Sequence, residues 1–259
     1  MLSKLDEIKS RRADVTDWVV HWTRMETMDG RTKSSWDILK NILQCGYIRP
    51  SKAPRLVGAK DQKKWCNTIR GKAPAVCFSE QTLKARLESF LADARRYSGC
   101  GIAFEKRSLF QYGGRPVIYG DDGLLARLHE DDKYLWVNYD PLPQMSHEYP
   151  TDWTHEREWR ARVLVYEDPE LGKSPLEGIP LVLPPIDIKR GRKILLPKIV
   201  VLNDAVEKTI REFISSMPEY NGPNCFIKYF FDHITELEII KLADVTDKDE
   251  RYWRLETFP

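Results

Sequence analysis

The chain has 259 residues, of which 42% are hydrophobic, 31% charged and 11% aromatic. This composition is typical of a globular protein with a sizeable core and excludes an intrinsically disordered chain. Because 41 Lys and Arg residues stand against 39 Asp and Glu residues, the formal net charge is only +2 and neither requires nor excludes a polyanionic partner.

The cysteines and the N-terminus bear on the compartment. The five cysteines are odd in number and form no C-x-x-C pair, so the sequence indicates neither a disulfide framework nor a cysteine-rich zinc site. The charged start MLSKLDEIKSRR lacks the apolar segment of a signal peptide, and no run approaches the roughly 18 apolar residues of a membrane span. We therefore expect a cytoplasmic protein without membrane contact. Neither His147 nor His155 has a zinc-ligand spacing, so no metal site is predicted.

Two strands and a helix are predicted in the first third of the chain. DWVVHWT at 17–23 and AVCFS at 75–79 read as short apolar strands. Between them, Ser34 is expected to cap a helix and Gly46 to end it in the left-handed conformation that other residues resist. The apolar stripe of this helix comprises Ile38, Leu39, Ile42 and Leu43. Residues 49–73 lack periodicity and predict a loop or an insertion.

A second helix and two further strands are expected next. The helix should end near Gly99, and its apolar face comprises Leu83, Leu87, Phe90, Leu91 and Ala94. GIAFEK at 101–106 and RPVIYG at 115–120 predict strands, separated by a turn that contains Gly113 and Gly114.

The most regular strand pattern lies in the second half of the chain. Residues 121–150 show no clear pattern, but REWRARVLVY at 157–166 alternates strictly between two faces. The residues expected on one face are Trp159, Ala161, Val163 and Val165, and those on the other are Glu158, Arg160, Arg162 and Leu164. After a proline-rich connection, KILLPKIVVL at 193–202 predicts extended structure, with Pro197 suited to an edge or a bulge.

The remaining elements complete an α+β pattern. Asn203 or Asp204 is expected to cap a helix whose apolar residues are Val206, Ile210, Phe213 and Ile214. CFIKYFF at 225–231 and LEIIKL at 237–242 are expected to be the final strands. Strand clusters broken by single helices, without regular βαβ alternation, favour an α+β fold, and the absence of any linker favours one domain over 1–259. No G-x-G-x-x-G or Walker sequence is present.

Three places put polar residues where a strand pattern expects apolar ones. His21 lies in VVHWTR, followed by Trp22 and Thr23; taken alone, such a histidine is more often a hydrogen-bonded core residue than a ligand. Phe78 and Ser79 end AVCFS, where Ser79 also suits a helix cap. The third place is THEREWR at 154–160. Its Glu156 and Glu158 are expected on one side of a strand, either lining a cleft or decorating a solvated sheet face.

In this order, a strand histidine, an aromatic–serine pair and a strand glutamate resemble the signature of the ADP-ribosyltransferase superfamily. HWTR, LQCGYIRP, AVCFSE, GIAFEK with GGRPVIYG, and EREWR are similar to bacterial abortive-infection AbiGi-like proteins and to E-x-E-W-R domains. The resemblance spans about 21–215. It implies two small, roughly perpendicular sheets with flanking helices and an NAD cleft between them.

The resemblance also implies roles for individual residues. Glu158 would stabilise the oxocarbenium-like transition state, and Glu156 would orient the acceptor or take its proton, unless it forms only a surface ion pair. His21 would contact the nicotinamide ribose. The remaining residues expected to bind NAD are Trp22, Thr23, Tyr47, Phe78, Ser79 and Tyr97, with either Tyr47 or Tyr97 stacking on the nicotinamide. The superfamily's Ser-x-Ser motif is missing here.

A basic segment suggests the acceptor. Residues 49–73 contain eight Lys and Arg residues and the single acid Asp61, a local charge of +7. Such a segment is either a solvated loop or a platform for phosphates, with an aromatic ring that stacks on a base. The residues expected to bind nucleic acid are Lys60, Lys63, Lys64, Trp65 and Arg70.

Together these features predict an NAD-dependent ADP-ribosyltransferase that modifies RNA or single-stranded DNA. The family resemblance implies a toxin in anti-phage defence, restrained by an antitoxin protein. The alternatives are a transferase acting on a protein, a non-catalytic binding or antitoxin-like protein that keeps the fold, and an RNA-binding or nuclease-like protein without NAD.

Overall fold

The computed structural model describes residues 16–24, 26–28, 31–50, 69–71, 73–92, 99–141, 152–163, 166–168, 172–174, 178–183, 195–222 and 224–245. Its main feature is a seven-stranded sheet in the order β15-β14-β6-β1-β5-β10-β7. These strands are β1 (Trp18–Trp22), β5 (Ala75–Ser79), β6 (Gly101–Glu105), β7 (Arg115–Pro116), β10 (Glu158–Arg162), β14 (Lys198–Val201) and β15 (Ile239–Lys241). Neighbouring strands run antiparallel, except for the parallel pair β14 and β15.

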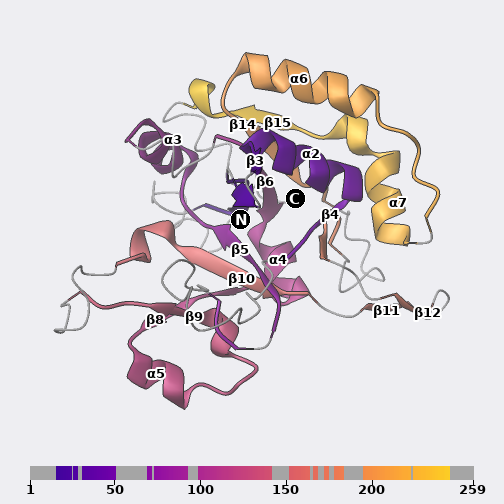
Figure 1. Ribbon diagram of the computed structural model, residues 1–259. Coiled ribbons are helices and arrows are strands. Elements are labelled where there is room, and N and C mark those ends of the chain that lie inside the picture. Colours follow the sequence, from indigo (N-terminus) through magenta and orange to yellow (C-terminus); the bar gives the residue numbers. More distant parts are fainter. Residues whose placement is uncertain are drawn as a thin grey trace, which may run out of the picture.

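Smaller elements surround the main sheet (Figure 1). Two-stranded sheets pair β2 (Glu26–Met28) with β3 (Arg31–Lys33), β4 (Tyr47–Ile48) with β13 (Ile179–Pro180), β8 (Ile118–Gly120) with β9 (Trp136–Asn138), and β11 (Tyr166–Asp168) with β12 (Gly172–Ser174). The helices are α2 (Ser35–Cys45), α3 (Leu83–Ala92), α4 (Lys106–Tyr112), α5 (Asp122–Arg127), α6 (Asp204–Ser215) and α7 (Cys225–Asp232). The chain is therefore an α+β protein, as predicted.

The two faces of the sheet carry different cores. On one face, Val19, Phe78 and Trp159 pack with residues of α2, α4, α6 and α7 into the larger apolar cluster. On the other face, Trp18, Val20 and Trp22 pack with Leu83 and Leu242 into a smaller cluster. Because side chains alternate along a strand, each residue of β1, β5 and β10 belongs to one of these two faces. The strand register therefore determines which candidate site residues can meet.

The helix α2 follows its sequence signals closely. The Ser34 hydroxyl accepts a hydrogen bond from the Asp37 backbone N–H, and the Asp37 carboxylate accepts one from the Ser34 backbone N–H. This reciprocal capping satisfies two donors that the first helical turn leaves open. Gly46 ends the helix with φ 72°, and a Cβ there would lie 2.8 Å from Ile227 Cγ2, so both backbone and space favour glycine.

Two predicted elements are wrong. Residues 225–231 form the helix α7, because the Asn224 side chain accepts hydrogen bonds from the Phe226 and Ile227 N–H groups and so starts a helix there. Residues 115–120 divide between β7 and β8, which belong to different sheets, and the helix α4 precedes them where only a turn was predicted. The segment without a pattern, 121–150, contains α5 and β9.

The apolar face predicted for α3 is also wrong in part. Leu91, predicted on the apolar face of α3, is 73% exposed. Arg160 lies on the same strand face as Glu158, as predicted, but it is 1% exposed, and its guanidinium donates to the carbonyl oxygens of Tyr134 and Trp136, just before and at the start of β9. None of the helices that the structure describes is long and apolar enough to cross a membrane.

Candidate functional site

The candidate site forms where β5 ends and β10 begins. In this antiparallel pair, Ser79 lies opposite Glu158 and Phe78 lies opposite Trp159. The strand β1 continues the same row on the other side of β5, where Val20 lies opposite Ser79. The sheet thus places the predicted segments His21, Phe78–Ser79 and Glu158 on three adjacent strands.

Glu158 is fixed by a buried arginine. Arg160 Nε donates to Glu158 Oε1 at 2.8 Å, and Arg160 Nη1 donates to the carbonyl oxygens of Tyr134 and Trp136 at 2.7 and 2.9 Å. The Arg160 side chain is 1% exposed and the Glu158 side chain 18% exposed. The guanidinium therefore orients the carboxylate from the buried side and leaves part of it accessible to a ligand.

Glu156 reaches the same region by a different backbone path from the one predicted. It ends a single 3₁₀ turn, Thr154–Glu156, and the strand begins only at Glu158. Between the two glutamates, Arg157 has φ 46° and ψ 52°, the left-handed conformation, which costs a non-glycine residue about 1–2 kcal/mol. The prediction that strand alternation aligns the two glutamates is therefore wrong in its reason. Glu156 is 8% exposed, and its Oε2 lies 3.6 Å from Nη2 of the exposed Arg24.

Tyr119 binds the backbone on both sides of Glu156. Its hydroxyl accepts a hydrogen bond from the Glu158 backbone N–H at 3.2 Å and donates one to the Trp153 carbonyl oxygen at 3.2 Å. Burial is the main reason why the pKa of Tyr119 is raised, and the negative charges of Glu158 and Glu156 raise it further. Tyr119 therefore fixes the backbone at the start of β10, between Trp153 and Glu158.

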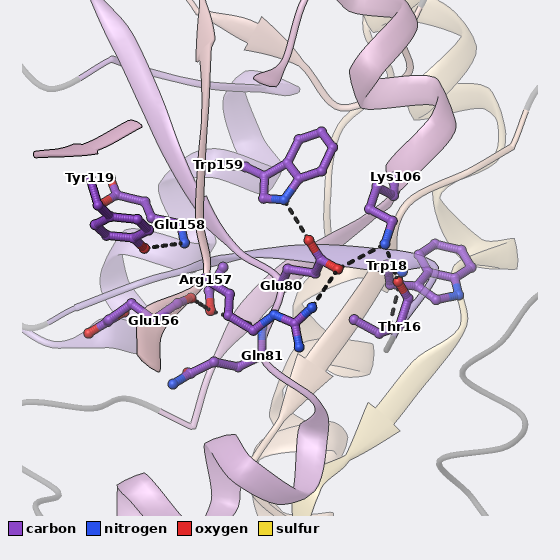
Figure 2. A network of polar contacts seen from close by, with 11 residues as sticks. Thr16, Trp18, Glu80, Gln81, Lys106, Tyr119, Glu156, Arg157, Glu158 and Trp159 are labelled. Atoms are coloured by element: carbon purple, nitrogen blue, oxygen red, sulfur yellow. Dashed lines mark hydrogen bonds and ion pairs between the residues drawn. The ribbon is translucent and has the colours of Figure 1, made fainter. Parts of the chain in front are cut away.

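Glu80 is the centre of a neighbouring polar network (Figure 2). Its carboxylate accepts hydrogen bonds from Trp159 Nε1 at 2.7 Å, Lys106 Nζ at 2.9 Å and Arg157 Nη2 at 3.3 Å. Lys106 Nζ also donates to the Thr16 carbonyl oxygen at 2.6 Å. Glu80 thus joins the end of β5, the start of β10 and the residues before β1.

The Ser79 hydroxyl links the end of β5 to the 3₁₀ turn that ends at Glu156. Its hydroxyl donates to the Glu156 carbonyl oxygen at 2.7 Å and accepts from the Gln81 N–H at 3.2 Å, and Gln81 Nε2 donates to the His155 carbonyl oxygen at 2.9 Å. Burial, and secondarily the Glu158 charge, raises the pKa of the Cys77 thiol on the same strand face, which disfavours its thiolate form.

His21 and Glu158 lie on opposite faces of the sheet. The imidazole packs edge-on against Phe78, with ring centroids 5.9 Å apart, on the face of the larger cluster. Glu158 shares the other face with Ser79 and Val20. His21 Nδ1 lies 2.9 Å from the Cys77 carbonyl oxygen, and since a carbonyl only accepts, Nδ1 carries the proton. Burial lowers the His21 pKa, which favours the neutral ring.

The other predicted NAD contacts are dispersed. Trp22 packs in the smaller cluster, with the Arg86 guanidinium 4.3 Å from its ring centroid. The Thr23 hydroxyl donates to the Cys100 carbonyl oxygen at 3.1 Å. Tyr47 lies on β4, outside the main sheet, and its hydroxyl accepts a hydrogen bond from Arg49. Tyr97 lies outside the described residues.

Most of the predicted nucleic-acid site also lies outside the described residues, namely Lys60, Lys63, Lys64 and Trp65. Arg70 is described, and its guanidinium lies 5.8 Å from the Trp136 ring centroid, so it packs beside the unit that receives Arg160.

Sequence reasoning missed three residues that organise the site: Glu80, Tyr119 and Arg160. The signal for Arg160 was a charge inside the best strand pattern, on the face expected for Glu158, and this face could either line a cleft or be solvated. Glu80 directly follows the predicted Phe78–Ser79 pair but received no role, and Tyr119 was not singled out. Their partners lie far away in sequence, such as Trp159 for Glu80 and Glu158 for Tyr119.

Comparisons with protein-family models, with curated proteins and with solved structures give no match to this chain. Within the part of the chain that the structure describes, no three His, Cys, Asp or Glu side chains gather in a way that could hold a metal ion. The side chains around Glu158 are therefore the features from which a function can be inferred.

Proposed function

We propose that the chain is an NAD-dependent ADP-ribosyltransferase in which Glu158 is the catalytic carboxylate. One observation carries the proposal: a partly exposed carboxylate, Glu158, is fixed by a buried guanidinium at 2.8 Å, two residues after a second carboxylate, Glu156. A fixed negative charge next to a reacting sugar is the feature that this chemistry needs.

The proposed reaction assigns the two carboxylates different roles. The bond between the nicotinamide nitrogen and ribose C1′ breaks, and its electron pair leaves with nicotinamide. Positive charge develops on the sugar, where Glu158 stabilises it more in the transition state than in the ground state. The acceptor forms the new bond to C1′ and gives up its proton, either to Glu156 or to water.

The NAD contacts in this proposal depend on the resemblance. The two-sheet cleft, and the roles of His21, Phe78 and the other predicted cofactor residues, are features of the ADP-ribosyltransferase superfamily that we carry over as proposals. The placement of His21 behind the sheet favours a supporting role for it, since its imidazole is engaged with Cys77 and Phe78.

The proposed acceptor is a nucleic acid, and RNA is favoured over single-stranded DNA. The support is the +7 charge of residues 49–73 around Trp65, which suits a phosphate backbone and an unpaired base. A role as an anti-phage toxin restrained by an antitoxin belongs to the same proposal and is supported by the family resemblance.

The test is turnover of labelled NAD in the presence of total RNA, single-stranded DNA and cell protein. Glu158→Gln should lower the rate by about 10²–10³-fold, as for loss of one charge-stabilising group. Glu207→Gln is the matched control, because Glu207 pairs with Arg211 at the far edge of the sheet. Absence of NAD turnover with every acceptor would refute the proposal, and an unchanged rate in Glu158→Gln would remove this residue from the mechanism.

A second candidate is a non-catalytic binding protein that keeps this fold. The observation that favours it is the separation of His21 and Glu158 onto opposite faces of the sheet. NAD or RNA binding without turnover would select this candidate.

A further inference from the structure

The backbone between the two candidate carboxylates is held in an unfavourable conformation. Among the described residues, Arg157 is the one non-glycine residue with a positive φ, and it lies directly between Glu156 and Glu158. Such a residue keeps this conformation only when its surroundings determine it, and such residues concentrate at functional sites. The contacts of Arg157 identify what determines it here.

Glu80 holds Arg157 at two points. The Glu80 backbone N–H donates to the Arg157 carbonyl oxygen at 3.0 Å, and the Glu80 carboxylate receives Arg157 Nη2 at 3.3 Å. The carboxylate is itself fixed by Trp159 and Lys106, which approach it from other elements, as Figure 2 shows. One residue thus binds both the backbone and the side chain of the left-handed position.

The left-handed residue determines where both glutamates lie. It ends the 3₁₀ turn of Glu156 and begins β10 at Glu158, whose N–H then reaches the Tyr119 hydroxyl at 3.2 Å. If Arg157 adopted the extended conformation, Glu156 would become part of the strand. Its carbonyl oxygen would then lose the hydrogen bond that it accepts from the Ser79 hydroxyl at 2.7 Å.

We propose that Glu80 and Arg157 form a clamp that positions the carboxylates of Glu156 and Glu158 relative to each other. Neither residue is assigned contact with the substrate, so both are positioning residues. The catalytic part of this inference rests on the proposed function, whereas the structural part does not.

The kinetic test compares three substitutions at Arg157. Glycine adopts the left-handed backbone conformation readily but has no side chain to bind Glu80. Alanine neither favours this conformation nor binds Glu80, and lysine keeps the positive charge. In Arg157→Gly the kcat of NAD turnover should fall by about 10- to 100-fold with little change in KM, because misplaced groups lose rate rather than affinity. Arg157→Ala should lose at least as much, and Arg157→Lys should recover part of the rate. The kcat of Glu80→Gln should be similar to that of Arg157→Gly. The kcat of Glu80→Asp should be lower than that of Arg157→Lys, because the shorter aspartate side chain does not reach Trp159 Nε1.

Arg211→Ala and Glu207→Gln are the controls, since this surface ion pair on α6 is 2.7 Å long and remote from the site. Both controls should keep the wild-type kcat. A fall in kcat that merely parallels a fall in melting temperature across all variants would overturn the proposal, because a purely structural pair would behave in this way.

Amide hydrogen exchange provides a readout that needs no substrate. In Arg157→Gly and Glu80→Gln, the amides of Glu80 and Glu158 should exchange about tenfold faster or more, because the local opening becomes easier. The Ile199 amide, which donates to the Glu238 carbonyl oxygen in the distant β14, should keep its rate. If wild-type protein turns over no NAD but these two amides respond, the proposed function fails and the clamp stands. Unchanged exchange at Glu80 and Glu158 overturns the clamp.

Discussion

At the scale of single residues, the lowered pKa of His21 makes the stability of the protein depend on pH. Burial lowers its pKa below the ordinary value of 6.5. Between the folded pKa and 6.5, the unfolded chain binds more protons than the folded protein, so the free energy of unfolding rises with pH. The stabilisation from His21 is therefore complete above pH 6.5 and is lost as the pH falls through the folded pKa.

Substitution of His21 by glutamine should remove this dependence. Glutamine offers an N–H donor to the Cys77 carbonyl oxygen but does not titrate. Urea denaturation from neutral to acidic pH should show the wild-type protein losing more stability than His21→Gln. Equal losses of stability in the two proteins would mean that the pKa of His21 is the same in the folded and the unfolded chain. The two proteins differ only at residue 21, so the comparison isolates the imidazole.

The resemblance makes a separate prediction for the same residue. If His21 contacts the nicotinamide ribose, His21→Ala should bind NAD more weakly while keeping a cooperative melting transition. Calorimetric titration of NAD into both proteins measures this. Equal affinity together with a lowered melting temperature would assign His21 to the core, in agreement with its bond to Cys77 and its packing on Phe78.

At the scale of elements, the cap of α2 gives a prediction about stability. Ser34→Ala removes both the acceptor for the Asp37 N–H and a donor to the Asp37 carboxylate. We expect a loss of about 1 kcal/mol in the free energy of unfolding, the usual cost of losing such a cap. Chemical denaturation measures it. Ser215→Ala is the control, because that hydroxyl donates only to the Arg211 carbonyl oxygen within α6, and a similar loss there would contradict a capping role for Ser34.

Local signals account for the elements that could be predicted. The cap at Ser34, the left-handed Gly46 and the cap at Asn203 all act within a few residues, so α2 and α6 were predicted correctly. CFIKYFF is apolar at almost every position and fits a buried strand or a helix equally well by pattern. Its buried residues Ile227 and Phe230 have helical spacing, and the Asn224 cap decides the outcome.

The candidate site could be predicted only in part, for a physical reason. Sequence order identified the segments that hold Ser79 and Glu158, and the sheet pairs these residues. The left-handed backbone of Arg157 carries no signal, since arginine does not favour that conformation. Its cause is Glu80, which lies far away in sequence and becomes its neighbour only when β5 and β10 pair.

At the scale of the whole molecule, charge is distributed unevenly. The net charge is +2, yet residues 49–73 alone carry +7. A segment of this charge attracts a phosphate backbone over several ångströms, and Trp65 within it offers a surface on which one base can stack. A flexible single strand also lets a target base enter a site without the cost of opening a duplex. These properties favour RNA or single-stranded DNA over a protein as the partner.

We therefore expect the protein to bind short RNA with an affinity that falls steeply with salt, with a slope of roughly −0.7 per phosphate contact on single strands. Changing Lys60, Lys63 and Lys64 together to Glu should weaken binding and flatten this slope, and Trp65→Ala should cost about 1–3 kcal/mol if a base stacks there.

The control reverses three exposed cations elsewhere, Arg127, Lys208 and Lys228, and so changes the net charge equally. If the affinity depended only on net charge, both triple variants would lose it alike, and the basic segment would be a solvated loop. ADP-ribose that appears only on protein would refute the choice of acceptor. A loss confined to the Lys60, Lys63 and Lys64 variant, with RNA labelling reduced in parallel, would place the acceptor on this segment.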